Sequence, residues 1–321
     1  MIGYNSFMEG KIFDSIIIGS GPAGLTAAIY NARSGLETIV IAGDIPGGQL
    51  TITTKVDNWP GFPNGIGGLK LMMDIQEQVK NWGVEIKQGR VEKIEKKNEL
   101  FEVSLDGGEI LNAKAVIVAT GAKTKWLGLD NEKKLIGKGV CSCATCDGMF
   151  FRDKEVAVVG GGNVACKDVD FLSKLAKKVY LIHRRNELRA TSVEAKLVME
   201  NKAVEKIWDS VVTEIIGKEK LEALRIKNVI SGEEKILPVN GLFVAIGREP
   251  ATGFVKDMVE LNEYGYIIVG KDAIYKTMTS MPGIFAAGDC MDDFYRQAIV
   301  AAGAGARAGI DVEKWLSNRK K

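Results

Sequence analysis

Short runs of apolar, mostly β-branched residues recur along the chain, and several of them end in glycine. Most are nearly continuous in hydrophobicity and do not alternate, which is typical of strands buried on both faces of a parallel sheet. Stretches with helical spacing of apolar residues lie between some of them. The strands predicted on this basis cover residues 13–18, 38–41, 115–121, 156–159, 179–182, 241–248 and 284–289.

The remaining pattern predicts helices and antiparallel strands. Apolar residues at helical spacing predict a helix over 69–82, with its stripe in the core and its end at Gly83. Strand-like alternation over 84–103, followed by a Gly107-Gly108 turn, predicts a hairpin. Further strands are expected at 224–229 and 234–239. Further helices are expected at 25–34, after the turn at 160–165 through Phe171 to Leu175, and from Arg296-Gln297-Ala298 onward.

The chain contains two strand–turn–helix units of the same kind, the first starting at Phe13 and the second at Val156. Such units form Rossmann-like dinucleotide-binding folds. The strands 115–121 and 241–248 both end in glycine, and we expect them to be the two crossings of one hinge. We therefore predict an α/β fold with two Rossmann-like domains, each in three ββα layers. The expected boundaries are 1–120 with 248–321 for the first domain and 121–247 for a second domain inserted into it.

Composition excludes several classes of function. The 321 residues carry a net charge of +2, so no global basic field would recruit nucleic acid. No apolar run reaches the roughly 20 residues that a membrane helix needs, and residues 1–11 lack the pattern of a secretory signal. Five cysteines in a chain of this length argue against a disulfide scaffold. We expect a cytoplasmic protein with one working dithiol.

The first unit carries the pattern G-x-G-x-x-G at Gly19, Gly21 and Gly24. After a strand and before a helix, these glycines form a tight turn, admit a pyrophosphate and let the helix pack on the strand. This context disfavours a chance glycine-rich turn. The acid that usually holds an NAD ribose is missing, because Ala42 and Gly43 follow the next strand. FAD is therefore the obvious candidate for this turn.

The second unit carries G-x-G-x-x-A from Gly160 to Ala165. Where an acid would favour NAD, this unit has His183, Arg184, Arg185 and Arg189. Guanidinium groups bind phosphate in bidentate fashion, so the cluster favours the 2′-phosphate of NADPH over NADH. The alternative is an ordinary solvated basic face, but three arginines at the end of this strand are a poor match to it. His183 is interpreted as part of the nucleotide site and not as an acid–base catalyst.

Between the two units lies a Cys-x-x-Cys motif, Cys143 to Cys146. Two intervening residues let both sulfurs meet at the first turn of a helix, whose N-terminus lowers a thiol pKa. Half of a zinc site is the alternative, but the other cysteines and His183 provide no second ligand pair. Reducing a disulfide takes two electrons, NADPH delivers a hydride, and a flavin is the usual carrier between them.

In combination, these motifs resemble the low-molecular-weight bacterial thioredoxin reductases over residues 12–316. Besides the glycine turns, the resemblance rests on Gly47-Gly48-Gln49-Leu50, Asn58-Trp59-Pro60-Gly61, Val118-Ala119-Thr120-Gly121-Ala122, Cys143-Ala144-Thr145-Cys146-Asp147-Gly148, His183-Arg184-Arg185, and Gly288-Asp289 with Arg296-Gln297-Ala298. It implies FAD in the first domain, NADPH in the second, a homodimer, and thioredoxin or a thioredoxin-like protein as substrate. No nucleic acid, membrane or metal partner is expected.

The resemblance also implies roles for individual residues. Cys146 would be the thiol next to the flavin, Cys143 the thiol that attacks the thioredoxin disulfide, and Asp147 the acid–base group for the leaving thiolate. FAD would be held by Gly19, Ser20, Gly21, Pro22, Ala23, Gly24, Gly48, Gln49, Asn58, Val91, Gly288, Asp289, Arg296, Gln297 and Ala298. NADPH would be held by Gly160, Gly162, Asn163, Val164, His183, Arg184, Arg185 and Arg189.

Two positions depart from the family pattern. Lys167 removes an acid after the second glycine turn, which bears on nucleotide preference or affinity. Cys141 stands where the family often has serine, and it is interpreted as a small buried residue and not as a third redox thiol. Cys166 and Cys290 are interpreted in the same way.

The dithiol and the second glycine turn are expected in the same domain, and both must reach the flavin in the other. We therefore predict a rotation about Thr120–Ala122 and Ile246–Arg248. The alternatives are a flavin reductase serving another thioredoxin-like or peroxiredoxin-system protein, an enzyme that takes electrons from ferredoxin, and a nucleotide-binding regulator without catalysis. The arginines oppose the ferredoxin enzyme, which predicts a degraded second site. Two intact glycine turns and a dithiol oppose the regulator.

Overall fold

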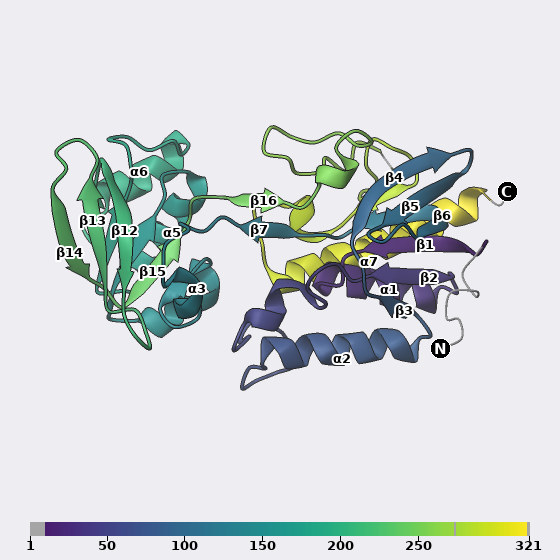
Figure 1. The fold of residues 1–321 in the computed structure, drawn as a ribbon, viewed down its shortest axis with the longest axis horizontal. Helices are drawn as coiled ribbons and strands as arrows, with labels where there is room; N and C mark the ends of the chain where they lie inside the picture. Colours follow the sequence, from purple (N-terminus) through teal and green to yellow (C-terminus); the bar gives the residue numbers. More distant parts are fainter. Residues whose placement is uncertain (1–9, 273, 320–321) are drawn as a thin grey trace. The chain divides into compact units, whose positions relative to one another are not determined.

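A computed structural model describes residues 10–272 and 274–319. The chain forms two compact units, one of residues 1–123 with 249–321 and the other of residues 124–248. Residues 1–9, which make up most of the segment expected to lack a secretory signal, are outside the described part. Each unit is built on a sheet whose central strands are parallel, with helices against it (Figure 1).

The sheet of the first unit contains β1 (Ile12–Ile18), β2 (Thr38–Ile41), β3 (Glu85–Lys87), β4 (Val91–Lys97), β5 (Leu100–Leu105), β6 (Ile110–Val118) and β17 (Ile284–Ala286). Its order is β3-β2-β1-β6-β5-β4, with β17 also beside β6. β1 pairs with β6 in parallel, from Ile12 opposite Asn112 to Ile18 opposite Val118. The first half of β6 pairs antiparallel with β5, and its second half pairs in parallel with β17. The parallel strands therefore end together at the edge where the glycine turn begins.

Helices cover one face of this sheet, namely α1 (Pro22–Arg33), α2 (Gly68–Asn81) and α7 (Ala298–Arg319). Because neighbouring side chains of a strand point to opposite faces, Ile17 packs with these helices. Ile16 packs on the other face with Ile94 and Phe101 of the antiparallel strands. Both faces exclude water, which explains the nearly continuous apolar runs of the central strands. The short 3-10 helices here are η2 (Gly48–Ile52), η4 (Gly253–Val255) and η5 (Gly288–Cys290).

The second unit repeats this plan on a smaller scale. Its parallel sheet has the order β11-β10-β9-β15-β8, with bounds β11 (Val204–Ile207), β10 (Lys178–Ile182), β9 (Glu155–Val159), β15 (Gly241–Val244) and β8 (Val140–Cys141). One face packs against the antiparallel sheet of β12 (Ser210–Ile216), β13 (Ala223–Asn228) and β14 (Glu234–Pro238). The other face packs against α5 (Asn163–Ser173) and α6 (Ser192–Glu200). The short helices are α3 (Glu132–Leu135), α4 (Ala144–Asp147) and η3 (Gly148–Phe151).

The chain passes between the units twice, and the two passages pair with each other. β7 (Ala122–Thr124) and β16 (Arg248–Pro250) form a two-stranded sheet. Backbone hydrogen bonds flank this pair, from Ala251 N to the Gly121 oxygen (3.0 Å) and from Lys125 N to the Gly247 oxygen (3.1 Å). The second unit thus lies, in sequence, within the first.

The predicted α/β class is confirmed, and each predicted strand and helix overlaps an observed element. The run 241–248 is correct at its start, whereas the strand expected at 115–121 begins earlier, at Ile110. The observed strands end at Val118 and Val244, because the following residues lead into the segments that connect the two units. Helix α6 was not predicted, since it exposes apolar side chains and lacks a clear buried stripe. In the described part of the chain, no helix has the length and apolarity to cross a membrane.

Candidate functional sites

The first glycine turn connects β1 to α1 and needs a glycine at two of its positions for different reasons. Gly19 has a φ of +114°, and an added Cβ would lie 2.3 Å from the carbonyl oxygen of Ala119. An added Cβ on Gly24 would lie 1.9 Å from the carbonyl oxygen of Gly19, so the helix could not approach the strand. At Gly21, by contrast, the space is open. An open, side-chain-free position at a turn is what the approach of a pyrophosphate requires.

The N-terminus of α1 is available for an anion. Gly21 is its N-cap, Pro22 and Ala23 are its first residues, and no side chain caps it. The Ser20 hydroxyl is used elsewhere, because it donates to the Ala42 oxygen (2.9 Å) and accepts from Gly47 N (2.9 Å). The unpaired N–H groups of a first helical turn bind phosphate. The turn therefore fits a dinucleotide.

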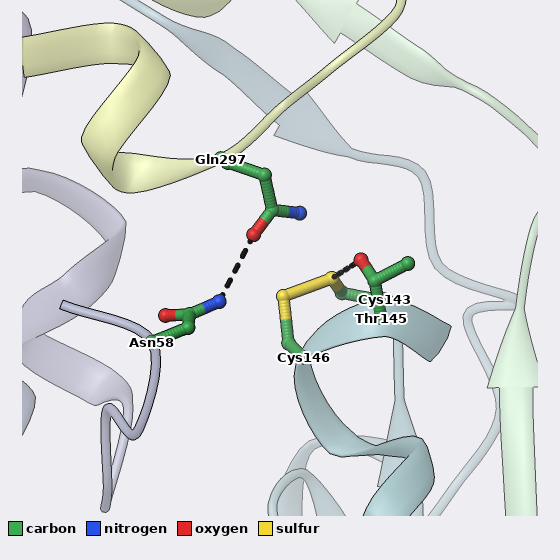
Figure 2. The surroundings of a disulfide bond; sticks show 5 residues. All are labelled: Asn58, Cys143, Thr145, Cys146 and Gln297. Carbon is green, nitrogen blue, oxygen red and sulfur yellow. Dashed lines mark hydrogen bonds between the residues drawn. A yellow bond between two sulfur atoms is a disulfide. The ribbon is translucent and has the colours of Figure 1, made fainter. Parts of the chain in front are cut away.

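Two of the residues predicted to bind FAD meet although 239 residues separate them, one in the loop before α2 and the other directly before the start of α7. The Asn58 amide donates to the side-chain oxygen of Gln297 (3.1 Å) (Figure 2). Beside them Arg296 adopts a φ of +52°, and its Nε is buried without a hydrogen-bond partner. A buried guanidinium nitrogen of this kind costs free energy unless a ligand satisfies it. This observation supports a polar or anionic group binding here.

Three other predicted FAD positions, Gly288, Asp289 and Ala298, lie at the same sheet edge, and Val91 is the exception. An added Cβ on Gly288 would lie 2.9 Å from the Cβ of Ala23, so Gly288 packs against α1. Asp289 follows it in η5 and is half-buried, and Ala298 begins α7. The Val91 side chain is in the core of the first unit, so only its backbone is left for a cofactor.

The second glycine turn reproduces the geometry of the first. An added Cβ on Gly160 would lie 2.4 Å from the Ala245 oxygen, while the space at Gly162 is open. Gly162 is the N-cap of α5, and no side chain caps this helix end. Asn163, the first residue, uses its side-chain oxygen to accept from Thr191 N (2.7 Å), and the half-buried Val164 follows. The turn therefore also fits a pyrophosphate.

His183 and the arginines follow β10 and are held against this turn. Arg189 N donates to the Gly161 oxygen (2.7 Å), which ties the arginine loop to the glycines. The arginine side chains are exposed, and within the described residues none of them forms an ion pair with a carboxylate; they are Arg184, Arg185 and Arg189. They are thus free to bind an anion. Burial, reinforced by the charge of Arg189, lowers the pKa of His183, so its imidazole is neutral near pH 7.

His183 also shapes the turn. An added Cβ on Gly161 would lie 2.2 Å from the imidazole Cε1, and the buried Nε2 has no hydrogen-bond partner. Gly161 is not part of the G-x-G-x-x-A pattern, although the run of three successive glycines was a signal for it. A side chain at this position would displace the histidine and, with it, the start of the arginine loop.

Cys143 and Cys146 form a disulfide with a Cα–Cα distance of 5.3 Å (Figure 2). Cys143 is the N-cap of the four-residue helix α4, as the Cys-x-x-Cys spacing predicted, and its Sγ lies 3.4 Å from the Thr145 hydroxyl. Cys146 is exposed and Cys143 is half-buried. In the described part of the chain, no group of His, Cys, Asp and Glu side chains is placed to hold a metal ion. In this structure the two sulfurs are bonded to each other, as a redox-active dithiol in its oxidised state would be.

Asp147 follows the dithiol directly. Burial raises the pKa of its carboxyl, and a hydrogen bond with the Cys141 thiol offsets part of this effect. A carboxyl with a raised pKa holds a proton at a higher pH than usual, which suits a group that donates to a thiolate.

The other three cysteines are free and buried, as predicted for Cys141, Cys166 and Cys290. Burial, together with the Asp147 charge, raises the pKa of Cys141 well above its ordinary value, and burial raises those of Cys166 and Cys290 to about 11. Thiols with raised pKa values are poor nucleophiles. Lys167, the other departure from the family pattern, is exposed on α5.

A family model described as "Pyridine nucleotide-disulphide oxidoreductase" matches residues 13–305. The chain is similar to the thioredoxin reductase of Rickettsia conorii, with 44% identity over 94% of this chain and 97% of the relative. Among solved structures, it resembles a thioredoxin reductase from Giardia duodenalis (TM-score 0.91, 42% identity, 96% of this chain and 99% of that one). It also resembles a Lactococcus lactis thioredoxin reductase described as being in the FR conformation (TM-score 0.64, 36% identity, 95% and 99%).

Proposed function

Because this chain belongs to the pyridine nucleotide-disulphide oxidoreductase family, we propose that it reduces the disulfide of thioredoxin with electrons from NADPH. Membership implies a flavin and a pyridine nucleotide, and FAD and NADPH are the forms that we propose. The observation that carries the proposal is the Cys143–Cys146 disulfide in the same unit as a glycine turn with unpaired arginines. The relative at 44% identity, named thioredoxin reductase, supports thioredoxin as the substrate.

The first glycine turn would hold FAD. Ser20 to Gly24 and the N-terminus of α1 would bind the pyrophosphate, with Gly48 beside them. Asn58, Arg296 and Gln297 would hold the part of the cofactor that extends toward α7. Bound there, a flavin accepts a hydride and passes an electron pair to a disulfide.

The second glycine turn would hold NADPH. The N-terminus of α5 at Asn163 would bind the pyrophosphate, because no side chain occupies that helix end. Arg184, Arg185 and Arg189 would bind the 2′-phosphate that distinguishes NADPH from NADH. The neutral His183 packs on Gly161 and so positions this loop without adding a charge.

The dithiol carries the electrons to the protein substrate. Two electrons and two protons open the Cys143–Cys146 disulfide to two thiols. The Cys143 thiol loses its proton, and the thiolate attacks the thioredoxin disulfide, forming a mixed disulfide and releasing one thioredoxin thiolate, which Asp147 protonates. The Cys146 thiol then loses its proton and attacks the Cys143 sulfur of the mixed disulfide, which restores the Cys143–Cys146 bond. The second thioredoxin sulfur leaves as a thiolate and takes up that proton, so that reduced thioredoxin is released.

We also propose a rotation of the second unit about the passages β7 and β16. The Lactococcus lactis structure is described as being in one particular conformation, FR. This description supports more than one arrangement of the two units among relatives. We further propose that the protein is a homodimer located in the cytoplasm.

The test is NADPH-dependent thiol release from a panel of thioredoxin-like proteins, with the purified flavin-loaded protein. We expect NADPH to bleach the flavin faster than NADH, and thioredoxin to release thiols catalytically. Thiol release only from a peroxiredoxin-system protein would show that this protein, and not thioredoxin, is the substrate. If reduced ferredoxin bleached the flavin and neither nicotinamide nucleotide did, ferredoxin and not NADPH would be the electron donor.

A further inference from the structure

Gln49 connects the first glycine turn to one of the two passages between the units. Its side-chain Nε2 donates a hydrogen bond of 2.7 Å to the carbonyl oxygen of Ala122, the first residue of β7. The same nitrogen lies 4.0 Å from the position of an added Cβ on Gly121. Gln49 thus reaches the passage where it leaves the first unit, whose first segment ends at Lys123.

The backbone that carries Gln49 is fixed to the glycine turn. Gly47 N donates to the Ser20 hydroxyl (2.9 Å). An added Cβ on Gly48 would lie 3.2 Å from the Cα of Gly21, so the two backbones are in close contact. Gly47 and Gly48 have φ values of +90° and +68°, which favour glycine and allow this approach. A displacement of the turn would therefore displace Gln49.

The other hydrogen bonds given for this passage join it to the second passage and not to the glycine turn. β7 contains three residues, and β16 is its partner strand. The Thr120 hydroxyl donates to the Ala251 oxygen (2.8 Å), which joins the two passages to each other and not to the turn. Lys123 and Lys125 are exposed. The Gln49 hydrogen bond is thus placed to decide how firmly β7 is held to the nucleotide-binding loop.

We propose that Gln49 is a positioning residue that couples occupancy of the first glycine turn to the order of β7. A dinucleotide bound at the turn restrains the loop of Gly47 to Gln49, and the Gln49 amide transmits that restraint to Ala122. The rotation then takes place about a strand whose start is fixed. By linkage, an ordered β7 raises the affinity of the turn for its ligand. The inference rests on the proposed function, because it takes FAD as the ligand.

The test measures tryptic cleavage after the exposed Lys123 and Lys125, with and without FAD, in the absence of NADPH and thioredoxin. Gln49→Leu removes the donor at similar volume. Thr51→Val is the matched control, because it removes a hydrogen bond within the same loop, from the Thr51 hydroxyl to the Gly48 oxygen (2.8 Å). In the wild type we expect FAD to slow cleavage about five-fold, the effect of one hydrogen bond on local opening. Gln49→Leu should lose that protection, and Thr51→Val should keep it.

Equal protection by FAD in Gln49→Leu and the wild type, at equal flavin content, would overturn the coupling. If Gln49→Leu does not retain FAD, Gln49→Glu, which lacks the amide donor at the same length, replaces it. Loss of FAD from both variants, with Thr51→Val still loaded, would assign Gln49 to holding the cofactor and would also overturn the coupling. A failure of the thioredoxin assay is distinguishable, since cleavage is measured without any redox substrate.

Discussion

At the scale of single residues, Cys146 separates the two halves of the proposed reaction. Cys146→Ser removes one sulfur of the disulfide but no residue proposed for either nucleotide. We expect this variant to keep flavin reduction by NADPH and to lose thioredoxin reduction. Stopped-flow flavin bleaching and steady-state thiol release measure the two activities.

Cys166→Ala is the matched control, because Cys166 is a buried free thiol. It should reduce thioredoxin at a rate within about two-fold of the wild type, as expected for a residue away from the chemistry. Wild-type thioredoxin reduction by Cys146→Ser would show that the dithiol assignment is wrong.

Asp147 is the residue for which a pH dependence is expected. Burial raises the pKa of its carboxyl, so the protonated form persists to a higher pH and is lost as the pH rises through that pKa. A step that needs this proton should therefore slow on the alkaline side. Asp147→Asn should lower thioredoxin reduction about 100-fold, the size of a general-acid contribution. It should also remove this limb of the pH profile while flavin reduction by NADPH persists; an unchanged profile would exclude Asp147 as the proton donor.

At the scale of secondary-structure elements, two glycines of the first turn are expected to have different roles, one in folding and the other in cofactor binding. Gly24→Ala places a Cβ against the Gly19 oxygen and should destabilise the first unit by about 1–3 kcal/mol. Gly21→Ala places a Cβ in open space, so it should weaken FAD binding at little cost in stability. Thermal unfolding without cofactor and FAD titration measure the two effects. Equal behaviour of the two variants would contradict the separate roles of these glycines.

The arginine loop after β10 is the element that would choose the nicotinamide nucleotide. Arg184→Ala combined with Arg185→Ala removes two cations that have no carboxylate partner among the described residues. The KM for NADPH should rise at least ten-fold, since each charge-assisted contact contributes about 1 kcal/mol or more, while the KM for NADH changes little. Arg225→Ala is the control, because this arginine of β13 is already paired with Glu214 of β12. A parallel rise for both nucleotides would argue against recognition of the 2′-phosphate.

At the scale of the whole molecule, the proposed rotation makes turnover depend on freedom between the units. A covalent cross-link that joins them should abolish thioredoxin reduction, because one fixed arrangement can serve only one half-reaction. A reducible linker is unsuitable in this assay, so a photocleavable one is used, and light should restore activity. Full turnover in the cross-linked protein would rule out the rotation.

Features that depend on local chemistry could be predicted from the order of the residues. The apolar runs define buried strands because both faces of each sheet are covered, and Gly19 and Gly160 mark the turns because a Cβ would clash there. Cys143 and Cys146 were assignable because their spacing closes a disulfide within one helical turn.

The tertiary structure alone decided which distant residues meet. Asn58 lies next to Gln297, Gln49 reaches Ala122, and His183 packs on Gly161, and no local pattern encodes these contacts. They depend on how loops from separate strands converge at one edge of a parallel sheet. Spacing and residue type dictate local geometry, but contacts between loops are set by packing, which is known only once the sheet and its helices are assembled.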